Sequence, residues 1–402
     1  MPIDLDVIIS VLLSLVAALV MSFAATPVVK SFAKRVGAMD VPRDNRRMHD
    51  HPIPRQGGLA IFLGFILSVV FFAEVTRQIQ GILLGSVIVV IVGAIDDILD
   101  IKPWIKFVAQ TAAALVAVYH GVVIDVLSNP IVVSNVDYIS LGWAAAPMTV
   151  VWIVAITNAV NWIDGLDGLS VGVSGIASVT MLVIALIVSN GNTAIVMAAL
   201  AGACIGFMPY NLNPAKIFAG DTGALLLGYV LSTMSIIGLF KFYAIVSFAV
   251  PFLILALPIF DVVFNTFRRI FHGQKPWVSD RGHVHHRLID MGLTQKQAVA
   301  ILYCISTVLG LAAVVLTASG EIRAIIFLLA FTAAAAIGIF ILRTARHDTR
   351  ERGDGEPGGD GRGERGDGEP GGSAQDAAHD PDAADPDGGD PDGGGGGDGD
   401  EH

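Results

Sequence analysis

The sequence predicts an all-α integral membrane protein. Its mean hydropathy is +0.67 and only 15% of its 402 residues are charged, whereas an ordinary soluble domain carries about 25%. Apolar runs long enough to cross a hydrocarbon core of about 30 Å recur along the chain. The runs lack the alternating pattern of a membrane β-barrel. Because every backbone polar group in lipid needs a partner within the protein, these runs predict a helix bundle.

Eleven apolar segments are candidate transmembrane helices. The first follows Asp4 and Asp6 without the basic stretch of a cleaved signal peptide, so we expect it to be retained. The loop from His120 to Ala146 contains two short β-prone stretches, 131–133 and 138–141, and predicts a small hairpin. The eleven segments lie near residues 6–28, 57–73, 79–95, 104–120, 147–161, 170–188, 193–210, 222–239, 243–265, 297–317 and 322–342.

Lysine and arginine are unevenly distributed between the two ends of these segments. Sixteen fall on one side, and three fall on the other: Arg77, Lys241 and Arg323. Basic loops favour the cytoplasm. We therefore expect the N-terminus outside, the C-terminus in the cytoplasm and the sixteen basic residues facing the cytoplasm.

The net charge of −11 belongs to the end of the chain. Residues 343–402 hold 18 acidic and 6 basic residues, a charge of −12, while residues 1–342 carry +1. The end is rich in Gly, Asp and Pro and has little to bury, which predicts a disordered cytoplasmic tail after a membrane domain of residues 1–342. The two cysteines, Cys204 and Cys304, lie in apolar segments, and we expect no disulfide.

Five polar clusters all fall on the basic side of the membrane. This is more than topology requires, although basic residues such as Arg268 and Arg269 can be explained by the positive-inside rule alone. The clusters are Arg46–Gly58, Asp96–Lys102 followed by Lys106, Asn158–Gly168, Asn211–Gly223, and Asp280–Arg287.

These residue types suit a metal and a diphosphate. Carboxylates are hard ligands for Mg²⁺, which prefers one or two of them plus substrate phosphates, and Lys, Arg and His suit phosphate oxygens. Gly220–Gly223 at a helix start offers free backbone N–H groups to an anion. If helical, Asp97 and Asp100 share a face, as do Asp164 and Asp167, and such like charges need a cation or a shifted pKa.

Simpler interpretations stand beside this one. A lone aspartate at a loop end, such as Asp164 or Asp221, is often a helix cap. The three histidines His283, His285 and His286 could form a zinc site, but no cysteine accompanies them. A secondary transporter is the main non-enzyme alternative; transporters place ionisable residues near the bilayer midplane. Here the span centres are nearly free of charge, with Asp261 the nearest exception.

Together these motifs resemble the polyprenyl-phosphate N-acetylhexosamine-1-phosphate transferases. The likeness rests on Asp96-Asp97 with Lys106, Asn158–Gly168, Asn211–Gly223 and His283–His286, and covers roughly residues 5–342. It implies a multi-pass enzyme of the cell membrane with its active site on the cytoplasmic face. The histidine run resembles the branch that uses UDP-GlcNAc, because Val284 interrupts the three consecutive histidines typical of the peptidoglycan branch, which uses UDP-MurNAc-pentapeptide and remains the alternative.

The resemblance also implies roles for individual residues. Asp221, with Asp97, is expected to hold Mg²⁺, for which Mn²⁺ can substitute. Asp96, Asp97, Asp164 and Lys106 are the expected catalytic residues, with Asp96, Asp97 and Lys106 beside the phosphates and Asp164 near the nucleoside end. Phe218 is expected to stack on uracil. The full set of expected substrate-binding residues is Asn158, Asn161, Asp167, Asn211, Phe218, Arg281, His283, His285, His286 and His49.

The implied reaction is attack by the phosphate of undecaprenyl phosphate on the sugar-linked phosphorus of UDP-GlcNAc, with UMP leaving. The acceptor phosphate is largely dianionic at pH 7, so a general base has little to supply. A double displacement through a covalent aspartate intermediate is the rival scheme. The expected partners are the two substrates and the bilayer, with no nucleic acid. The sequence leaves the oligomeric state open, with a homodimer as one option.

Overall fold

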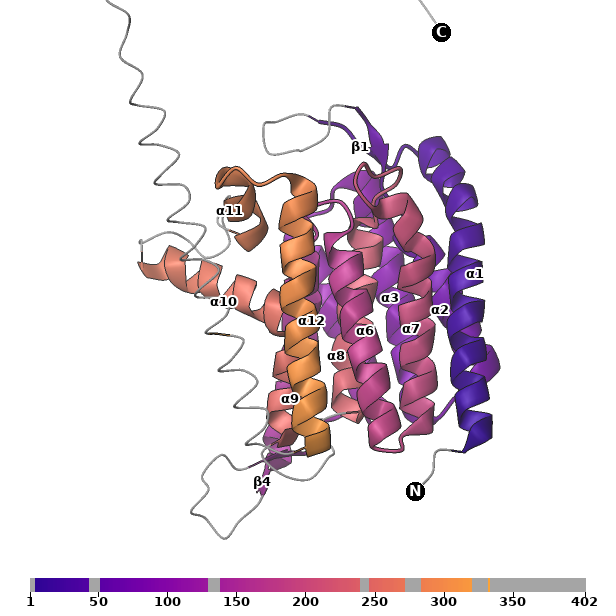
Figure 1. Cartoon of the computed structure of the whole chain (residues 1–402), viewed down its shortest axis with the longest axis vertical. Helices are drawn as coiled ribbons and strands as arrows, with labels where there is room; N and C mark the ends of the chain where they lie inside the picture. Colours follow the sequence, from indigo (N-terminus) through magenta and orange to yellow (C-terminus); the bar gives the residue numbers. More distant parts are fainter. Residues whose placement is uncertain are drawn as a thin grey trace, which may run out of the picture. The chain divides into compact units, whose positions relative to one another are not determined.

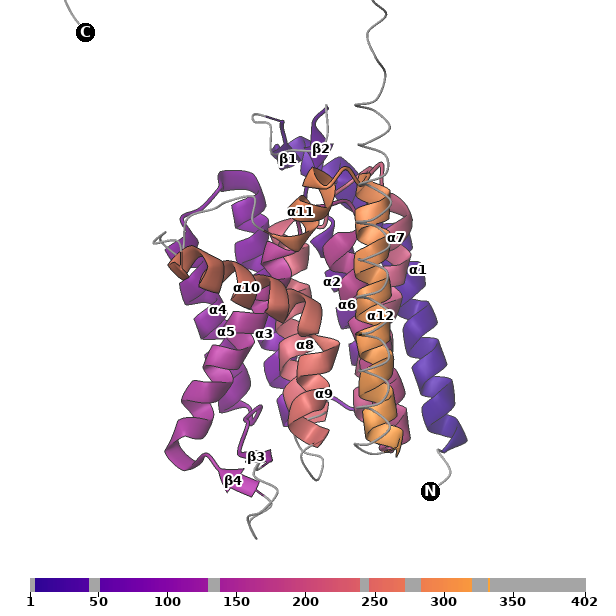
Figure 2. The same cartoon turned by 60° about the vertical axis from the view of Figure 1, so that its left-hand side comes forward.

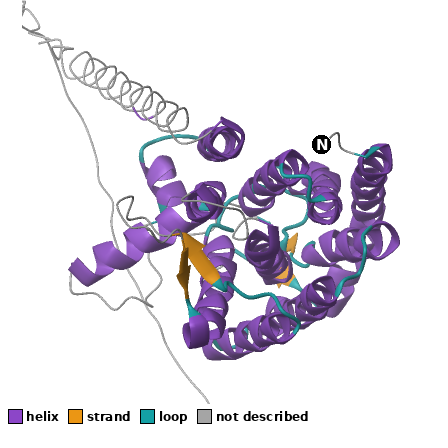
Figure 3. Cartoon of the chain, turned by 90° about the horizontal axis from the view of Figure 1, so that it is seen from below, coloured by secondary structure: helices purple, strands orange, loops and turns teal. Residues whose placement is uncertain are grey.

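The computed structural model describes residues 4–42, 51–128, 138–238, 246–271, 283–319 and 332. Within these residues the protein is a helix bundle with two small β-hairpins at opposite ends (Figures 1 and 2). Viewed from below, most of the helices are seen nearly end-on (Figure 3). The helices are α1 (Leu5–Val36), α2 (Gly58–Phe72), α3 (Arg77–Leu99), α4 (Pro103–Tyr119), α5 (Ala145–Trp162), α6 (Leu169–Ile187), α7 (Gly191–Asn211), α8 (Gly220–Gly238), α9 (Val246–Ile254), α10 (Ala256–Phe271), α11 (Val284–Asp290) and α12 (Gln295–Ser319).

Seven helices in the described part of the chain are long and apolar enough to cross a membrane. They are α1, α3, α5 with the 3₁₀ turn Gly142–Ala144 before it, α6, α7, α8 and α12, and the apolar helices α2 and α4 are shorter. The multi-pass helical class is therefore confirmed. The count of eleven and the direction of the termini stay predictions, and the last predicted segment, 322–342, falls almost wholly outside the described residues.

One predicted transmembrane segment is not a single helix. The run 243–265 is divided between α9 and α10, with Leu255 at the break. Pro258 explains the position, because a proline ring clashes with the carbonyl four residues earlier, which here belongs to Ile254 at the end of α9. Figures 1 and 2 show that α9 follows the bundle direction, whereas α10 lies across it.

The centre of the bundle is α8, whose residues from Thr222 to Ser235 are all buried. Close packing elsewhere depends on small residues. Gly202 and Gly206, one turn apart on α7, lie against the backbone carbonyls of Leu15 and Leu19 of α1, where any side chain would collide. Small residues at such spacing allow helix backbones to approach closely inside a membrane.

The two hairpins mark the ends of the bundle. Strands β1 (Met39–Asp40) and β2 (Ile53–Pro54) pair antiparallel at the end where α12 begins (Figure 2). Strands β3 (Val126–Ser128) and β4 (Tyr138–Ser140) pair at the other end. The predicted hairpin is therefore present, although its first strand lies earlier than the expected stretch 131–133, which is outside the described residues.

Candidate functional site

A polar cavity of about 290 Å³ opens at the β1–β2 end of the bundle. It draws together residues from all five polar clusters that the sequence analysis identified. Seven predicted site residues line it: Asp97, Asp164, Asp167, Asn211, Phe218, Asp221 and His286. Its other lining residues are Asp40, Arg55, Gly165, Leu166, Gly220 and Gln295.

The chain after β2 is joined to the segment before α8, which fixes one wall of the cavity. The Phe218 N–H donates to the Pro54 carbonyl at 2.9 Å, and the Gly57 N–H donates to the Phe218 carbonyl at 2.8 Å. A side chain at Gly57 would lie 2.7 Å from that carbonyl oxygen, so the pairing requires glycine there. The aromatic ring predicted to stack on uracil is thus carried by a hydrogen-bonded backbone.

Asp97 caps the start of α8. Its carboxylate accepts the N–H groups of Asp221 at 2.9 Å and Thr222 at 3.2 Å, and the Thr222 hydroxyl at 2.6 Å. Asp97 is 3% exposed, and Gly220, in the left-handed region at φ +70°, leaves room for the carboxylate. A carboxylate at the positive end of a helix dipole is favourable. Both Asp97 oxygens therefore accept backbone N–H groups at the start of α8, and Asp97 also lines the cavity.

Lys106 lies between two carboxylates. Its ammonium group is 3.0 Å from Asp96 Oδ2 and 2.6 Å from Asp221 Oδ2. The other Asp221 oxygen accepts from the Asn161 side chain at 3.0 Å, and the other Asp96 oxygen accepts from the Ile101 N–H at 2.9 Å. Like charges held together need a cation, and Lys106 supplies one. We call Asp96, Asp97, Lys106 and Asp221 the aspartate cluster.

The helical spacing suggested for the aspartate pairs does not hold. Helix α3 ends at Leu99, and Asp100, with φ +48°, turns away to pair with Arg55 at 2.8 Å. Asp164 and Asp167 lie in the loop between α5 and α6 rather than on a helix face. Local turn geometry, not the i,i+3 rule, places these carboxylates.

Asp164 and Asp167 have different environments although they are three residues apart. Burial raises the pKa of Asp164 to about 7, against the opposing effect of the Ser170 hydroxyl, which donates to it at 2.5 Å. Asp167 accepts from the Asn213 side chain at 2.9 Å and from the Ala215 N–H at 3.0 Å. Asp164 is thus poised to titrate near neutral pH, while Asp167 ties the α6 loop to the segment before α8.

The predicted asparagines are only partly at the cavity. Asn211 lines it and donates to the Ile217 carbonyl at 3.1 Å. Asn161 reaches the cavity through Asp221. Asn158 instead pairs with Gln110 of α4 and does not line the cavity. Asn158 therefore joins α4 to α5 in this structure.

The histidines form a separate unit, which we call the histidine segment (residues 283–290). His283 Nδ1 lies 2.6 Å from the Asp261 carboxylate. His285 is 2% exposed and packs against Gly165, and burial, followed by the nearby His286, lowers its pKa to about 3. Of the three, only His286 lines the cavity. Two further predicted site residues, His49 and Arg281, lie outside the described residues.

Some residues of the site were not anticipated. Arg55 was visible inside the first polar cluster but had no predicted role; its Nε donates to the Asp97 carbonyl at 3.1 Å. Thr222 and Ser170 hold predicted carboxylates, and neither carries a sequence signal beyond its position near them. Asp261 was noted only as a charge within an apolar run.

The residues present are compatible with a magnesium ion held mainly by a substrate. No group of three or more candidate metal ligands occurs among the residues that the structure describes. Mg²⁺ usually takes one or two carboxylates and completes its shell with phosphate oxygens and water. Asp221, which lines the cavity at the start of α8, can supply such a carboxylate, with Asp97 adjacent.

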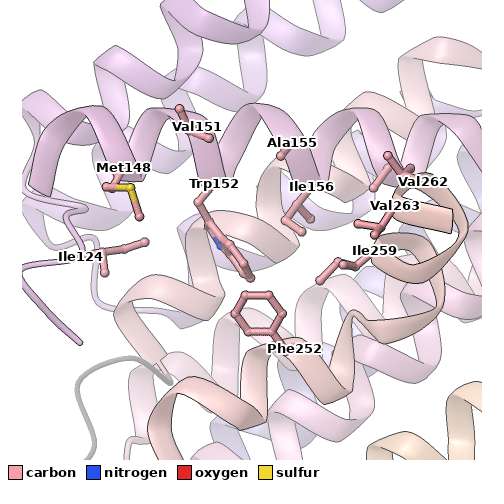
Figure 4. A pocket seen from close by; sticks show the side chains of 11 residues that line it. Ile124, Met148, Val151, Trp152, Ala155, Ile156, Phe252, Ile259, Val262 and Val263 are labelled. Atoms are coloured by element: carbon pink, nitrogen blue, oxygen red, sulfur yellow. The ribbon is translucent and has the colours of Figure 1, made fainter. Parts of the chain in front are cut away.

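An apolar groove of about 280 Å³ lies along α5, α9 and α10 (Figure 4). The rings of Trp152 and Phe252 meet edge-to-face in it, with centroids 5.0 Å apart. Ile156, Ile259 and Val263 lie around them (Figure 4). The groove has almost no polar lining and can take an extended hydrocarbon chain.

Comparison with known proteins decides the family. Residues 79–239 match the model of glycosyl transferase family 4. A probable undecaprenyl-phosphate N-acetylglucosaminyl 1-phosphate transferase of Bacillus subtilis is 39% identical over 311 residues, which are 77% of this chain and 85% of the relative. The chain belongs to glycosyl transferase family 4.

Two further relatives show the range of proteins that the chain resembles. A decaprenyl-phosphate N-acetylglucosaminephosphotransferase of Mycobacterium tuberculosis is 33% identical over 324 residues, 73% of this chain and 78% of the relative. A phospho-N-acetylmuramoyl-pentapeptide-transferase of Caldicellulosiruptor bescii is 32% identical over 237 residues, 56% of this chain and 72% of the relative. The two relatives named for GlcNAc phosphate transfer therefore match a longer part of the chain.

Proposed function

We propose that this protein transfers GlcNAc-1-phosphate from UDP-GlcNAc to undecaprenyl phosphate, giving undecaprenyl-diphospho-GlcNAc and UMP. The observation that carries the proposal is Lys106 between Asp96 and Asp221 at the start of α8, beside a polar cavity. This arrangement provides charge neutralisation and positioning, which are what phosphoryl transfer chiefly needs.

The two substrates have opposite solubility, and the molecule has a matching pair of sites. The UDP-sugar is water-soluble and suits the polar cavity, whereas the isoprenoid chain of the acceptor suits the apolar groove in Figure 4. They can meet only at a membrane boundary. We infer from the distribution of basic residues that this boundary is cytoplasmic.

The proposed step is a single displacement. An oxygen of the lipid phosphate attacks the sugar-linked phosphorus, and the bond from that phosphorus to the bridging oxygen breaks. The bridging oxygen leaves with its electron pair on UMP. Arg55, which lines the cavity, offers positive charge to the phosphates, and Lys106 offsets the negative charge of Asp96 and Asp221 beside them. Asp221, with Asp97 beside it, would hold Mg²⁺, which would supply further charge neutralisation when bound.

We assign the nucleoside end to the lining residues Phe218, Asn211 and Asp167. Phe218 offers an aromatic face for uracil, and Asn211 and Asp167 offer polar groups close to it. Asp164, whose pKa is raised to about 7 by burial, also lines the cavity. The histidine segment faces the sugar and diphosphate through His286.

The test is UMP release by the purified full-length protein in detergent with undecaprenyl phosphate and Mg²⁺. UDP-GlcNAc and UDP-MurNAc-pentapeptide are offered separately. Asp221→Asn is the inactive variant, and Asp125→Asn, an exposed acid beside β3, is its matched control. We expect turnover of UDP-GlcNAc alone, lost with EDTA, restored by Mg²⁺ or Mn²⁺, and lost in Asp221→Asn only.

The other outcomes are equally informative. Turnover of the pentapeptide substrate alone would move the protein to the peptidoglycan branch. UMP release without lipid, accompanied by exchange of labelled UMP into the donor, would support the covalent scheme. No lipid-dependent UMP from either donor would refute the proposal.

A further inference from the structure

Helix α10 has its polar side turned inward. Asp261, Asn265 and Arg269 recur every four residues, so they share one face, and they are 1%, 0% and 4% exposed. Phe260, Phe264 and Phe267 of the same helix are exposed. Burying a carboxylate is costly unless its oxygens accept hydrogen bonds. The buried Asp261 carboxylate therefore needs donors for both oxygens.

Asp261 holds the start of the histidine segment with both oxygens. Its Oδ2 is 2.6 Å from His283 Nδ1, and its Oδ1 accepts the Val284 N–H at 2.7 Å. The Asn265 side chain donates to the Asp261 carbonyl at 2.8 Å and lies 3.2 Å from His283 Nδ1. His283, the residue before α11, makes no side-chain cap of its own. Asp261 therefore caps α11 from another helix.

The position of α11 determines where the other histidines lie. The rings of His283 and His285 are stacked 5.7 Å apart, and those of His285 and His286 are 4.4 Å apart. His285 packs against Gly165, a lining residue of the cavity, and His286 lines the cavity itself. A displacement at His283 would therefore be passed to the cavity wall through three contiguous rings.

We propose that Asp261 is a positioning residue for the histidine segment and so controls binding of the UDP-sugar at the cavity. The inference rests on the proposed function. Two acceptor oxygens are needed for the His283 ring and the Val284 amide, and an amide side chain offers only one. The same helix lines the apolar groove through Ile259, Val262 and Val263. A substitution at Asp261, on the inward face, should therefore leave the lining of the groove unchanged.

The first test measures kinetics of UMP release for Asp261→Asn, with Asp125→Asn, an exposed acid beside β3 and outside the histidine segment, as the matched control. Loss of a partner that orients a metal-binding histidine typically costs about 10- to 100-fold in activity, and we take the same order of magnitude for the histidine segment. We expect that loss in kcat/KM for UDP-GlcNAc, a rise in its KM, and a KM for undecaprenyl phosphate within about twofold of wild type. A purely structural defect would lower the active fraction and leave both KM values unchanged.

The second test uses His283→Asn and the double variant. Residues that act as one unit are strongly non-additive, so the double variant should be no worse than the more damaged single variant. Losses that multiply would overturn the proposal. So would wild-type kinetics in Asp261→Asn.

A third measurement does not depend on catalysis. Hydrogen exchange of the full-length protein should show faster exchange in residues 284–290 of Asp261→Asn, with α8 unchanged. Unchanged exchange in residues 284–290 would overturn the proposal. If wild type releases no UMP but the exchange result holds, the proposed function fails while the positioning role of Asp261 stands.

Discussion

The aspartate cluster and the histidine segment reach the same cavity but are held in different ways. The cluster joins α3, α4, α5 and α8 inside the bundle through backbone amides, Lys106 and Asn161. The histidine segment is attached through Asp261 and the packing of His285 on Gly165. The family match, residues 79–239, contains the whole cluster and ends before the histidine segment. We expect the cluster to set the chemistry and the histidine segment to set which donor is accepted.

The largest expected effect comes from removing Lys106. The substitution Lys106→Met leaves Asp96 and Asp221 facing each other without their shared cation. Activity should fall about 10²- to 10³-fold, the range for loss of one charge-stabilising group. The measurement is lipid-dependent UMP release, with Lys102→Met at the exposed start of α4 as control. A loss of less than tenfold would mean that the cluster is not the chemical centre.

The second effect tests whether Asp97 acts through α8. Thr222→Val removes the hydroxyl that donates to Asp97 at 2.6 Å, while Thr222→Ser retains it. We expect Thr222→Val to lower activity about tenfold and the unfolding free energy by about 1 kcal/mol, and Thr222→Ser to stay near wild type. Melting temperature and the Mg²⁺ dependence of UMP release check this. If only Asp97→Asn is impaired, with both Thr222 variants normal, Asp97 acts directly on substrate or metal.

A smaller effect separates the two substrates. Ala155→Phe places a ring in the apolar groove and should raise the KM for undecaprenyl phosphate several-fold without changing that for UDP-GlcNAc. Val179→Phe places the same ring in a second apolar cavity, of about 430 Å³, between α6, α7 and α12. It serves as the control. Equal effects of the two variants on the lipid KM would argue against the groove as the acceptor site.

The smallest effect is on the pH dependence of the unfolding free energy, to which Asp164 and His285 contribute with opposite sign. His285 packs against Gly165, the residue that follows Asp164. The pKa of Asp164 is about 7 in the folded state, compared with an ordinary value of 3.8. Between about pH 4 and 7 the folded state therefore holds more protons than the unfolded state. The free energy of unfolding consequently falls as the pH rises through this range. The pKa of His285 is about 3 in the folded state, compared with an ordinary value of 6.5. Between about pH 3 and 6.5 the unfolded state therefore holds more protons than the folded state. The free energy of unfolding consequently rises with pH through this range. Each slope is at most about 1.4 kcal/mol per pH unit.

Single variants should expose these opposing slopes. Relative to wild type, Asp164→Asn should gain stability as pH is raised from 5 to 6.5, and His285→Gln should lose it. Melting temperatures in detergent at pH 5.0, 5.75 and 6.5 give the comparison. Parallel curves for wild type and both variants would show that neither group titrates as its burial indicates.

Much of the site could be found in the sequence because its parts are locally marked. Polar residues at the ends of apolar runs stand out. Six of the seven cavity-lining residues with predicted roles, Asp164 and Asn211 among them, lie in clusters that directly follow or precede a predicted span. Asp261 did not stand out because it is a single charge within an apolar run. The break at Leu255 could have been inferred from Pro258, but an apolar run with proline also reads as one kinked helix.

The sequence by itself determined the membrane class, the positions of most helices and the gathering of polar clusters at one end, because chain length, hydropathy and charge act locally. Only the tertiary structure decided which partner each polar group has. Asp97 caps a helix 125 residues away along the chain, Lys106 lies between Asp96 and Asp221, and Asp261 holds His283. A buried carboxylate must satisfy both oxygens, and which donors can do so depends on which helices pack beside it.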